Sequence, residues 1–341
     1  MTETQKPTVI VSHPLPPDWI TDLSSEAELI FGPKGGQGLS RDLKKELPRA
    51  KGLLALLDDP VDREILQAGT SLRVITNMAV GYDNIDVELC TELGIPVGNT
   101  PGVLTEGTAD LTVALLLAAA RKLPQSSRDA REGRWSTWDP TGWLGEDLTG
   151  ATAGIIGMGK IGTAVARRLA AFDTRLLFTN RSPKPDLERE LDALQVPLSQ
   201  LLQESDFICL HVPLTSETKG MIDKKALRQM KHTAILINAA RGEIVDTRAL
   251  ITALQKGWIQ AAGLDVTDPE PLPPDHLLYS LENCLITPHI GSATRNTRRM
   301  MAELAVQNLL AGLKGKRLPH CVNPEVYEKS TVDHPSSDPR R

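Results

Sequence analysis

Short apolar runs alternate with helix-like segments in two series along the chain. The first series consists of Thr8–Ser12, Gly52–Leu57, Arg73–Asn77 and Val97–Asn99. Such runs, rich in aliphatic and β-branched residues and bounded by turn-forming residues, are typical of buried strands. Strands that alternate with helices favour a parallel sheet with crossover connections.

The second series begins at Thr152 and is longer. Its strand-like runs are Ala153–Ile156, Arg175–Thr179, Phe207–His211, Ala234–Asn238, Ala262–Val266 and Cys284–Ile286. Six strands with helices between them are what a Rossmann domain uses. The pattern therefore predicts an α/β protein with two doubly wound parallel sheets.

Two long helices are predicted beside these strands. Thr105 can cap a helix over Glu106–Arg121, whose nearly all-round apolar character indicates burial in a core or against a second subunit. Ser292 can cap an amphipathic helix over Ala293–Leu310, and Gly312 would end it.

The first series of strands is short and lacks an element to close it. The predicted C-terminal helix can pack on that sheet and complete the domain. In addition, 341 residues are too many for one typical hydrophobic core, so two domains are expected. We therefore expect a discontinuous flavodoxin-like domain over 1–103 plus 292–325, with a Rossmann domain inserted over 104–291. Residues 326–341 are charged and rich in Pro and Ser, which predicts a disordered tail.

The composition of the chain disfavours several classes of binding partner. The net charge is −5 and no run of Lys and Arg reaches five, so nucleic acid is a poor candidate. The longest apolar run, Val113–Ala120, is far short of the ~20 residues that span a bilayer. The four cysteines form no Cys-x-x-Cys pair, so neither a metal site nor a redox motif is expected. Cys209 and Cys284 lie in apolar runs, and buried thiols favour a cytoplasmic location.

A glycine-rich turn, Gly157-Met158-Gly159-Lys160-Ile161-Gly162, joins a predicted strand to a predicted helix. Glycines alone are weak signals, but this context is that of a dinucleotide-binding fingerprint rather than a plain strand-turn-helix. The first glycine permits the tight turn, the second lets the backbone approach a pyrophosphate, and the third allows close helix packing. Gly157, Gly159, Lys160, Ile161 and Gly162 are therefore predicted to bind a dinucleotide, and the inserted domain to be the cofactor domain.

The next strand ends at Asn180-Arg181-Ser182, where NAD-specific domains usually carry an acidic residue that binds the ribose hydroxyls. A neutral Asn180, with the Arg181 guanidinium and the Ser182 hydroxyl, suits a 2′-phosphate instead. We therefore predict that NADPH is preferred and that NADH is the possible alternative. A solvated loop charge is the other interpretation of Arg181.

Three residues far apart in the chain carry candidate chemistry. They lie in the sequence motifs Ala239-Ala240-Arg241-Gly242, Asp268-Pro269-Glu270-Pro271 and Pro288-His289-Ile290-Gly291. A guanidinium holds a carboxylate, an imidazole moves a proton, and a carboxylate orients the imidazole and favours its protonated form. Each residue alone could be structural. Together Arg241, Glu270 and His289 are the parts that a 2-keto acid reductase needs.

These motifs occur in the order found in the D-isomer-specific 2-hydroxyacid dehydrogenases, which the chain resembles over about residues 50–320. The likeness is closest to the glyoxylate/hydroxypyruvate reductase branch, through Trp135–Trp143, Ala262–Pro273 and His289–Thr294. It implies NADPH-dependent reduction of glyoxylate and hydroxypyruvate to glycolate and D-glycerate.

The resemblance also implies roles for single residues. Arg241 would bind the substrate carboxylate and carbonyl, and His289, paired with Glu270, would be the acid/base. The backbone N–H groups of Val80 and Gly81 match the family's substrate loop. Further cofactor-contact positions are Pro213, Ala239, Gly291 and Asp265, the last near the nicotinamide carboxamide.

Trp138 lies in an aromatic loop and is a candidate for selecting a small polar substrate across a dimer interface, with loop packing as the alternative. The helix Leu111–Ala120 and this loop lie where subunits of the family pair, so a homodimer is expected.

Other activities of the same fold are alternatives. One is a D-3-phosphoglycerate dehydrogenase or another D-2-hydroxyacid dehydrogenase, and the non-enzymatic one is a dinucleotide-sensing scaffold like the family's corepressors. A formate dehydrogenase is disfavoured because that branch uses Gln where Glu270 stands.

Overall fold

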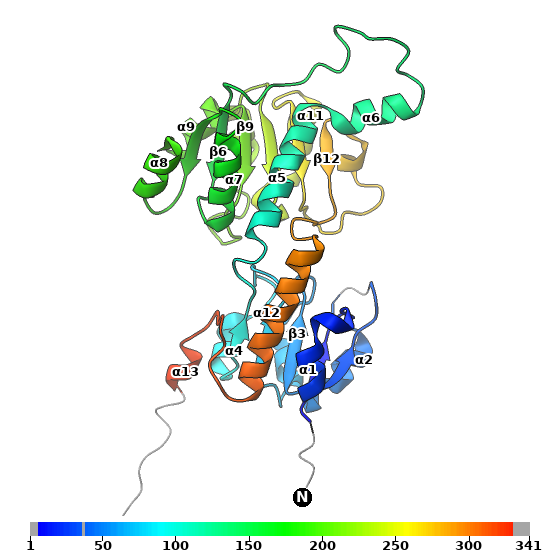
Figure 1. Cartoon of the computed structure of the whole chain (residues 1–341), viewed down its shortest axis with the longest axis vertical. Helices are drawn as coiled ribbons and strands as arrows, with labels where there is room; N and C mark the ends of the chain where they lie inside the picture. Colours follow the sequence, from blue (N-terminus) through cyan, green and yellow to red (C-terminus); the bar gives the residue numbers. More distant parts are fainter. Residues whose placement is uncertain (1–5, 36–37, 330–341) are drawn as a thin grey trace, which may run out of the picture. The chain divides into compact units, whose positions relative to one another are not determined.

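The computed structural model describes residues 6–35 and 38–329. It divides into two compact units, one of Met1–Leu104 with Thr294–Arg341 and the other of Thr105–Ala293. The chain leaves the first unit after its fifth strand and returns to it with a long helix (Figure 1). Among the described residues, no helix is long and apolar enough to cross a membrane.

The first unit contains a five-stranded sheet in the order β2-β1-β3-β4-β5, and every neighbouring pair is parallel. The strands are β1 (Thr8–Val11), β2 (Glu28–Phe31), β3 (Gly52–Ala55), β4 (Val74–Asn77) and β5 (Val97–Gly98). This is the flavodoxin-like strand order. The sequence prediction omitted β2, because this edge strand is only partly buried and lacks a clear apolar pattern.

Short helices connect these strands, and a long C-terminal helix closes the sheet. They are α1 (Thr21–Glu26), α2 (Arg41–Glu46), α3 (Arg63–Ala68), α4 (Val87–Glu92) and α12 (Arg295–Leu313). The predicted cap and end of the last helix are wrong. Thr294, not Ser292, caps α12 by accepting a hydrogen bond from the Thr297 N–H at 3.1 Å. Gly312 lies inside α12, where a Cβ would come within 2.5 Å of Val74, so it permits close packing on β4.

The chain beyond α12 stays on the first unit. Asn323 is fully buried; its side chain accepts a hydrogen bond from the Val97 N–H at 2.8 Å and donates one to the Ile95 carbonyl at 3.1 Å. A short helix, α13 (Val326–Lys329), follows, with Val326 buried. The expected disorder therefore does not begin at residue 326, because this segment packs; the rest of that predicted tail, 330–341, lies outside the described residues.

The second unit contains a seven-stranded parallel sheet in the order β12-β11-β10-β9-β6-β7-β8. The strands are β6 (Thr152–Ile156), β7 (Arg175–Thr179), β8 (Ala193–Gln195), β9 (Phe207–Leu210), β10 (Ile235–Asn238), β11 (Ala261–Leu264) and β12 (Cys284–Ile286). Six of them were predicted. The seventh, β8, is a three-residue edge strand with an exposed Leu194, so its sequence carries little signal. The prediction of two doubly wound parallel sheets is confirmed.

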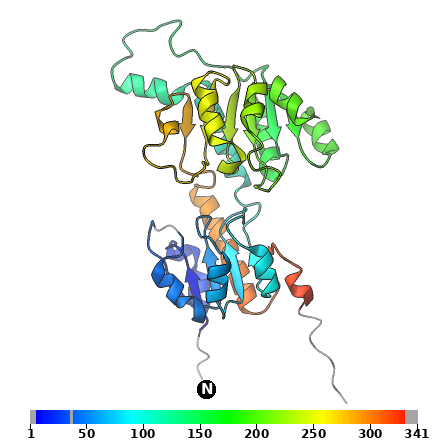
Figure 2. The ribbon, with the colours of Figure 1, turned by 180° about the vertical axis from the view of Figure 1, so that it is seen from behind.

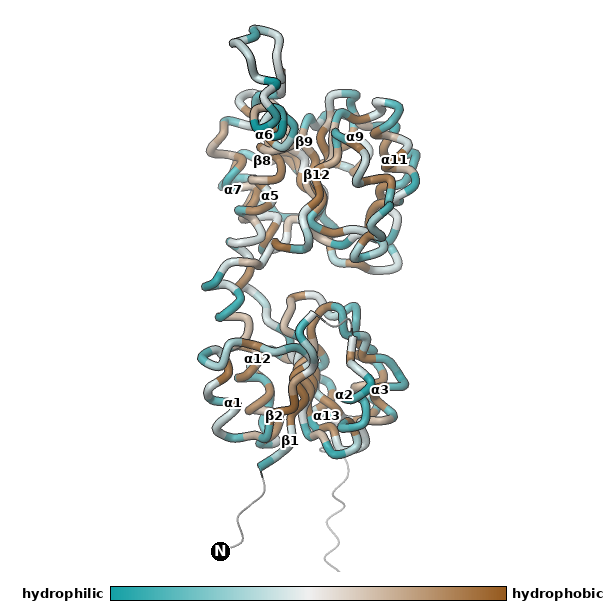
Figure 3. The backbone as a smooth tube through the Cα atoms, turned by 90° about the vertical axis from the view of Figure 1, so that its right-hand side faces the viewer, coloured by the Kyte–Doolittle hydropathy of each residue, from teal (hydrophilic) through white to brown (hydrophobic). Residues whose placement is uncertain are grey.

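Helices cover both faces of this sheet, and the apolar strands lie between them (Figure 3). On one face lie α5 (Thr105–Ala120), α7 (Lys160–Ala170) and α8 (Pro185–Leu191) (Figure 1). On the other lie α9 (Leu198–Glu204), α10 (Lys224–Gln229) and α11 (Thr247–Gln255) (Figure 2). Leu115 and Leu116 of α5 are buried in the core, as the apolar composition of that helix predicts.

Candidate active site

Three neighbouring strands of the second unit deliver the predicted catalytic residues. Arg241 follows β10, Glu270 follows β11 and His289 follows β12. Parallel strands end at one edge of the sheet, so the three loops emerge side by side. The three residues are far apart in the sequence, but the order of the strands in the sheet brings them to neighbouring strand ends.

The segment after β10 holds Arg241 in an extended backbone conformation just before a 3₁₀ turn, Gly242–Ile244. The buried Asn238 fixes it: its amide donates to the Arg241 carbonyl at 2.8 Å and accepts from the Ala240 N–H at 3.1 Å. A Cβ on Gly242 would lie 2.0 Å from the Thr267 carbonyl oxygen. Gly242 thus lets the segment that carries Arg241 contact the segment that carries Glu270.

His289 and Glu270 form a close pair. The Nδ1 atom of His289 lies 2.5 Å from Oε1 of Glu270, and Oε2 of Glu270 accepts a hydrogen bond from the Thr267 N–H at 3.1 Å. The two side chains are 28% and 34% exposed, so they remain accessible to a ligand. Because Glu270 occupies Nδ1, the Nε2 atom of His289 is the one left to exchange a proton with a substrate.

The surroundings of Glu270 keep it ionised. Its partial burial alone would raise its pKa, but the hydrogen bond and charge of His289, the Thr267 N–H and the charge of Arg241 hold the pKa below its ordinary value. Glu270 therefore presents a carboxylate to the imidazole at neutral and mildly acidic pH.

The pH profile of catalysis should reflect this pair. In the wild-type protein, protonation of Glu270 should reduce activity only below the ordinary titration range of a glutamate, because its pKa is lowered. Glu270→Gln removes this titrating carboxylate, so the loss of activity that its protonation causes on the acid side should be absent from the variant's profile. Profiles of kcat/KM against pH for both proteins would test this. Superimposable profiles would contradict a proton role for the pair.

Asp265 fixes the turn that carries His289. Its carboxylate, only 2% exposed, accepts hydrogen bonds from the Thr287 hydroxyl at 2.6 Å, the Ile290 N–H at 2.8 Å and the Gly291 N–H at 2.7 Å. His289 itself has a φ of 52°, a left-handed conformation that such bonds help to maintain. Asp265 and Gly291 were selected from the sequence as cofactor contacts. Their mutual hydrogen bond, which positions His289, was not foreseen, although a buried acid at a strand end is a recognisable signal.

The glycine-rich turn has the geometry that a dinucleotide requires. Gly157 has a φ of 98°, and Gly162 packs so tightly that a Cβ would lie 2.0 Å from the Gly157 carbonyl oxygen. Nothing lies within 4 Å of a Cβ built on Gly159, which leaves open space where a pyrophosphate would approach. Lys160 and Ile161 are the first residues of α7 and Gly159 is its N-cap, so this space lies at the helix N-terminus, where the first N–H groups have no partner within the helix. The turn therefore fits a dinucleotide.

The end of β7 is organised by Asn180. Its side-chain oxygen accepts a hydrogen bond from the Met158 N–H at 3.1 Å, and its amide donates to the Ser182 carbonyl at 2.8 Å. Arg181 and Ser182 are exposed, and within residues 6–35 and 38–329 no hydrogen bond or ion pair involves the Arg181 guanidinium. Two other predicted cofactor residues follow neighbouring strands. Pro213 lies after β9 and is exposed, and Ala239 lies after β10 and is half-buried.

The remaining predicted residues lie elsewhere. Val80 and Gly81 belong to the first unit, in the loop after β4. Trp138 lies in the second unit, in the segment after α6 (Leu123–Arg131), which extends beyond the body of that unit (Figure 1). Residues of α6 bond to Glu282, which precedes β12, whereas His289 follows that strand. The tryptophan segment thus starts from the edge of the sheet opposite to the catalytic residues.

Comparison with known proteins assigns the chain to a family. Residues 113–291 match the NAD binding domain of the D-isomer specific 2-hydroxyacid dehydrogenases. The chain belongs to this family. It is also 47% identical over 324 residues to a glyoxylate reductase of Korarchaeum cryptofilum, covering 95% of this chain and 98% of the relative. A glyoxylate reductase/hydroxypyruvate reductase of Mus musculus is 48% identical over 281 residues, covering 82% and 86%.

Solved structures of D-2-hydroxyacid dehydrogenases share the fold. An NADPH-dependent glyoxylate/hydroxypyruvate reductase of Sinorhizobium meliloti, in complex with NADP and malonate, is 33% identical with a TM-score of 0.82, covering 93% of this chain and 97% of that one. A D-lactate dehydrogenase of Aquifex aeolicus, with NAD and lactic acid, is 30% identical with a TM-score of 0.83, covering 92% and 98%. The predicted family and the predicted D-2-hydroxyacid dehydrogenase enzyme class are confirmed, and with them a nicotinamide dinucleotide as cofactor.

Proposed function

We propose that this dehydrogenase reduces glyoxylate to glycolate and hydroxypyruvate to D-glycerate, with NADPH as the preferred cofactor. The observation that carries the chemistry is the His289–Glu270 pair at the strand edge that also presents Arg241 and the glycine-rich turn. The names of the relatives, glyoxylate reductase and glyoxylate reductase/hydroxypyruvate reductase, support the choice of substrate.

Each residue has a distinct task in the proposed mechanism. The Arg241 guanidinium binds the substrate carboxylate and polarises the adjacent carbonyl, and the N–H groups of Val80 and Gly81 also bind the carboxylate. His289 donates a proton from Nε2 to the carbonyl oxygen, while Glu270 holds the ring by Nδ1 and stabilises its positive charge. The bound nicotinamide supplies the hydride.

A matrix of kcat/KM values tests the substrate assignment. Glyoxylate, hydroxypyruvate, pyruvate and 3-phosphohydroxypyruvate would each be assayed with NADPH and NADH by following nicotinamide absorbance. We expect the highest values for the first two acids. A preference for the phosphorylated acid would favour a phosphoglycerate dehydrogenase. No turnover of any acid would favour a dinucleotide-sensing scaffold.

The cofactor preference is proposed from the residues after β7. Asn180 adds no negative charge beside the ribose, and the exposed Arg181 and Ser182 can bind a 2′-phosphate. Relatives have been solved with NADP and with NAD, so these residues must decide.

Asn180→Asp should shift the preference toward NADH. A carboxylate at this position would repel a 2′-phosphate and accept hydrogen bonds from ribose hydroxyls, so kcat/KM with NADPH should fall about 10- to 100-fold. Steady-state kinetics with both cofactors would measure the change. Lys184→Gln, which removes a nearby charge from the same loop, is the control for a general electrostatic effect. A wild-type protein that already favours NADH would refute the proposed preference.

We also propose that two copies pair through the segment 132–147. Trp135 and Trp138 are 66% and 81% exposed, and with Trp143 they border a hollow of about 310 Å³. Exposed aromatic clusters of this kind mark protein interfaces. A second copy would cover them and could place its Trp138 near this chain's substrate.

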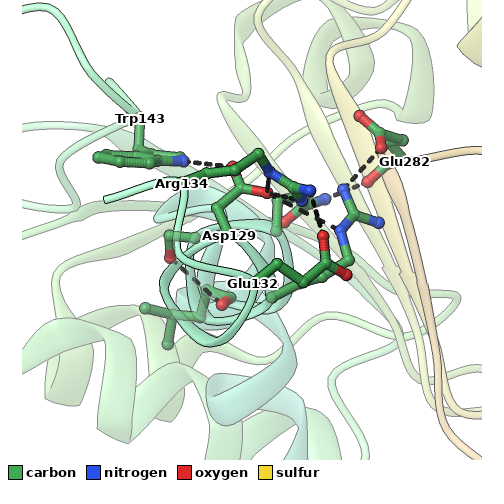
Figure 4. Close-up of polar contacts among 9 residues, drawn as sticks. Asp129, Glu132, Arg134, Trp143 and Glu282 are labelled. Carbon is green, nitrogen blue, oxygen red and sulfur yellow. Dashed lines mark hydrogen bonds and ion pairs between the residues drawn. The ribbon is translucent and has the colours of Figure 1, made fainter. Parts of the chain in front are cut away.

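A polar network orders that segment (Figure 4). Asp129 of α6 accepts a hydrogen bond from the Trp143 indole N–H at 2.8 Å and also pairs with Arg134. These hydrogen bonds lower the pKa of Asp129. Arg128 bonds Glu282 at 2.6 Å, which ties α6 to the sheet. Trp143 and Arg134 are thus held against α6, and a segment already held at these points loses less entropy when a second copy covers it.

Trp138→Ala should change substrate selection. Loss of a large aromatic wall should alter the ratio of kcat/KM for glyoxylate to that for pyruvate by about 10-fold, the scale of a pocket contact. Trp138→Phe should retain most of the ratio, and Leu194→Ala, at an exposed edge position, should leave it unchanged. Light scattering would report the oligomeric state of each protein. An unchanged ratio in a dimeric Trp138→Ala protein would reject the specificity role.

A cytoplasmic location is proposed from the thiols. All four cysteines are free, and burial raises the pKa of Cys209 and of Cys284 to about 12. Thiols of this kind are compatible with a reducing compartment.

A further inference from the structure

The loop after β4 in the first unit is held by its carbonyl oxygens. The Ala79 carbonyl accepts a hydrogen bond from the Thr100 N–H at 2.8 Å, and the Val80 carbonyl accepts one from the Asn99 side chain at 2.9 Å. The Gly81 carbonyl accepts one from the Asn77 side chain at 2.8 Å. Three consecutive carbonyls are thus bonded to the ends of β4 and β5.

These bonds dictate where the N–H groups point. A peptide group is planar and trans, so its N–H points opposite to its carbonyl. The Ala79 carbonyl shares its peptide with the Val80 N–H, and the Val80 carbonyl shares its peptide with the Gly81 N–H, so bonding these two carbonyls fixes both N–H groups. The bond from Asn77 to the Gly81 carbonyl fixes the next peptide, and so holds Gly81 from its other side. Neither N–H donates a hydrogen bond to any residue in the described parts of the chain. They are donors held in one direction without a protein acceptor.

The Asn77 anchor is itself secured from a second loop. Asn77 is fully buried, and its amide uses its other hydrogen to bond Oδ1 of Asn84 at 2.9 Å. The Asn84 amide in turn donates to the Leu56 and Asp59 carbonyls, both at 2.9 Å. These carbonyls belong to the loop after β3. The side-chain amides of Asn77 and Asn84 therefore link the loop after β4 to the loop after β3, and both amide groups donate to protein acceptors.

We propose that Asn77, Asn84 and Asn99 are positioning residues that aim the Val80 and Gly81 N–H groups at the substrate carboxylate. This rests on the proposed function of those N–H groups. The asparagines contact no reacting atom; they remove alternative orientations of the loop before the substrate arrives. Pre-organised donors lose less entropy and reorganise less when an anion binds.

Substitutions that remove the amide donors test the proposal. Asn99→Ala and the nearly isosteric Asn99→Asp both free the Val80 carbonyl, and Asn77→Ala frees the Gly81 carbonyl. Each should raise the KM for glyoxylate about 10- to 100-fold, the worth of a charge-assisted hydrogen bond. The inhibition constant of oxalate, an unreducible analogue, should rise in parallel. The dissociation constant of NADPH, measured by fluorescence, should stay unchanged, because the predicted cofactor residues lie in the other unit.

Two further variants separate positioning from folding and from the substrate assignment. Asn323→Ala removes a buried amide of the same unit that bonds none of residues 77–84, so it should lower the Tm without changing the KM. Gly81→Pro removes one proposed donor directly. If Gly81→Pro raises the KM while the Asn77 and Asn99 variants keep it at the wild-type value, the positioning role is overturned. If Gly81→Pro also leaves the KM unchanged, the substrate role of the loop is wrong as well, whereas the wild-type kcat/KM matrix reports on the proposed reaction independently.

Discussion

We expect His289→Asn to reduce glyoxylate about 10²- to 10⁴-fold more slowly than the wild-type protein, the usual contribution of a general acid. Asparagine is the informative substitution because His289 has a φ of 52°, and asparagine tolerates that left-handed conformation. The turn that Asp265 holds should therefore survive, and the loss should lie in the proton transfer itself. Single-turnover kinetics with saturating NADPH would measure it.

The control for this prediction is another histidine of the same unit. His232 is exposed, and its Nδ1 atom lies 3.0 Å from the Gly257 carbonyl, so His232→Asn should keep full activity. NADPH binding should be unchanged in both variants. A His289→Asn protein that turns over at the wild-type rate would remove His289 from the mechanism and leave the pair with Glu270 a structural contact.

The second large effect is expected at Arg241. Arg241→Ala should lower kcat/KM for glyoxylate by about 10³-fold or more, through both a higher KM and a lower kcat, because the guanidinium is proposed to bind the carboxylate and to polarise the carbonyl. Arg241→Lys should recover only part of this loss, since an ammonium cannot donate two parallel hydrogen bonds to one carboxylate. Steady-state kinetics of the three proteins would test the prediction.

A structural role for Arg241 would give a different pattern. The side chain also donates to its neighbour's carbonyl, Ala240 O, at 2.8 Å, so its removal could loosen the turn. In that case Arg241→Ala would lower the Tm, and Arg241→Lys would not restore activity in proportion to charge. Arg248→Ala, an exposed arginine on α11, should change neither quantity.

The glycine-rich turn and the candidate catalytic residues could be selected in the sequence because their chemistry depends on local features. Position 157 requires a positive φ, and position 162 has no room for a Cβ. Glycine meets both requirements, so the residue type alone indicates them. Arg241 and His289 could be placed at strand ends because apolar runs precede them. The edge strands β2 and β8 were not predicted, since short, half-exposed strands have no regular apolar pattern.

The supporting residues of the site were not predictable in the same way. Asp265 looks in the sequence like a ligand of the cofactor, and Asn77 carries no particular signal. Their partners, the Ile290 N–H and the Gly81 carbonyl, are 25 and 4 residues away along the chain. A polar side chain at a strand end can bond to many groups, and only the packed loops decide which one it meets.

The sequence by itself determined the fold class, the dinucleotide turn and the candidates for the acid, the guanidinium and the carboxylate, because periodicity, glycine and functional groups are local properties. Only the tertiary structure decided that Glu270 meets Nδ1 of His289, that Asp265 fixes the histidine turn and that asparagine side chains bond the Val80 and Gly81 carbonyls. Within each unit, these are contacts between segments that the parallel strand order brings to the same edge of that unit's sheet. Their geometry depends on close packing, which no single segment specifies.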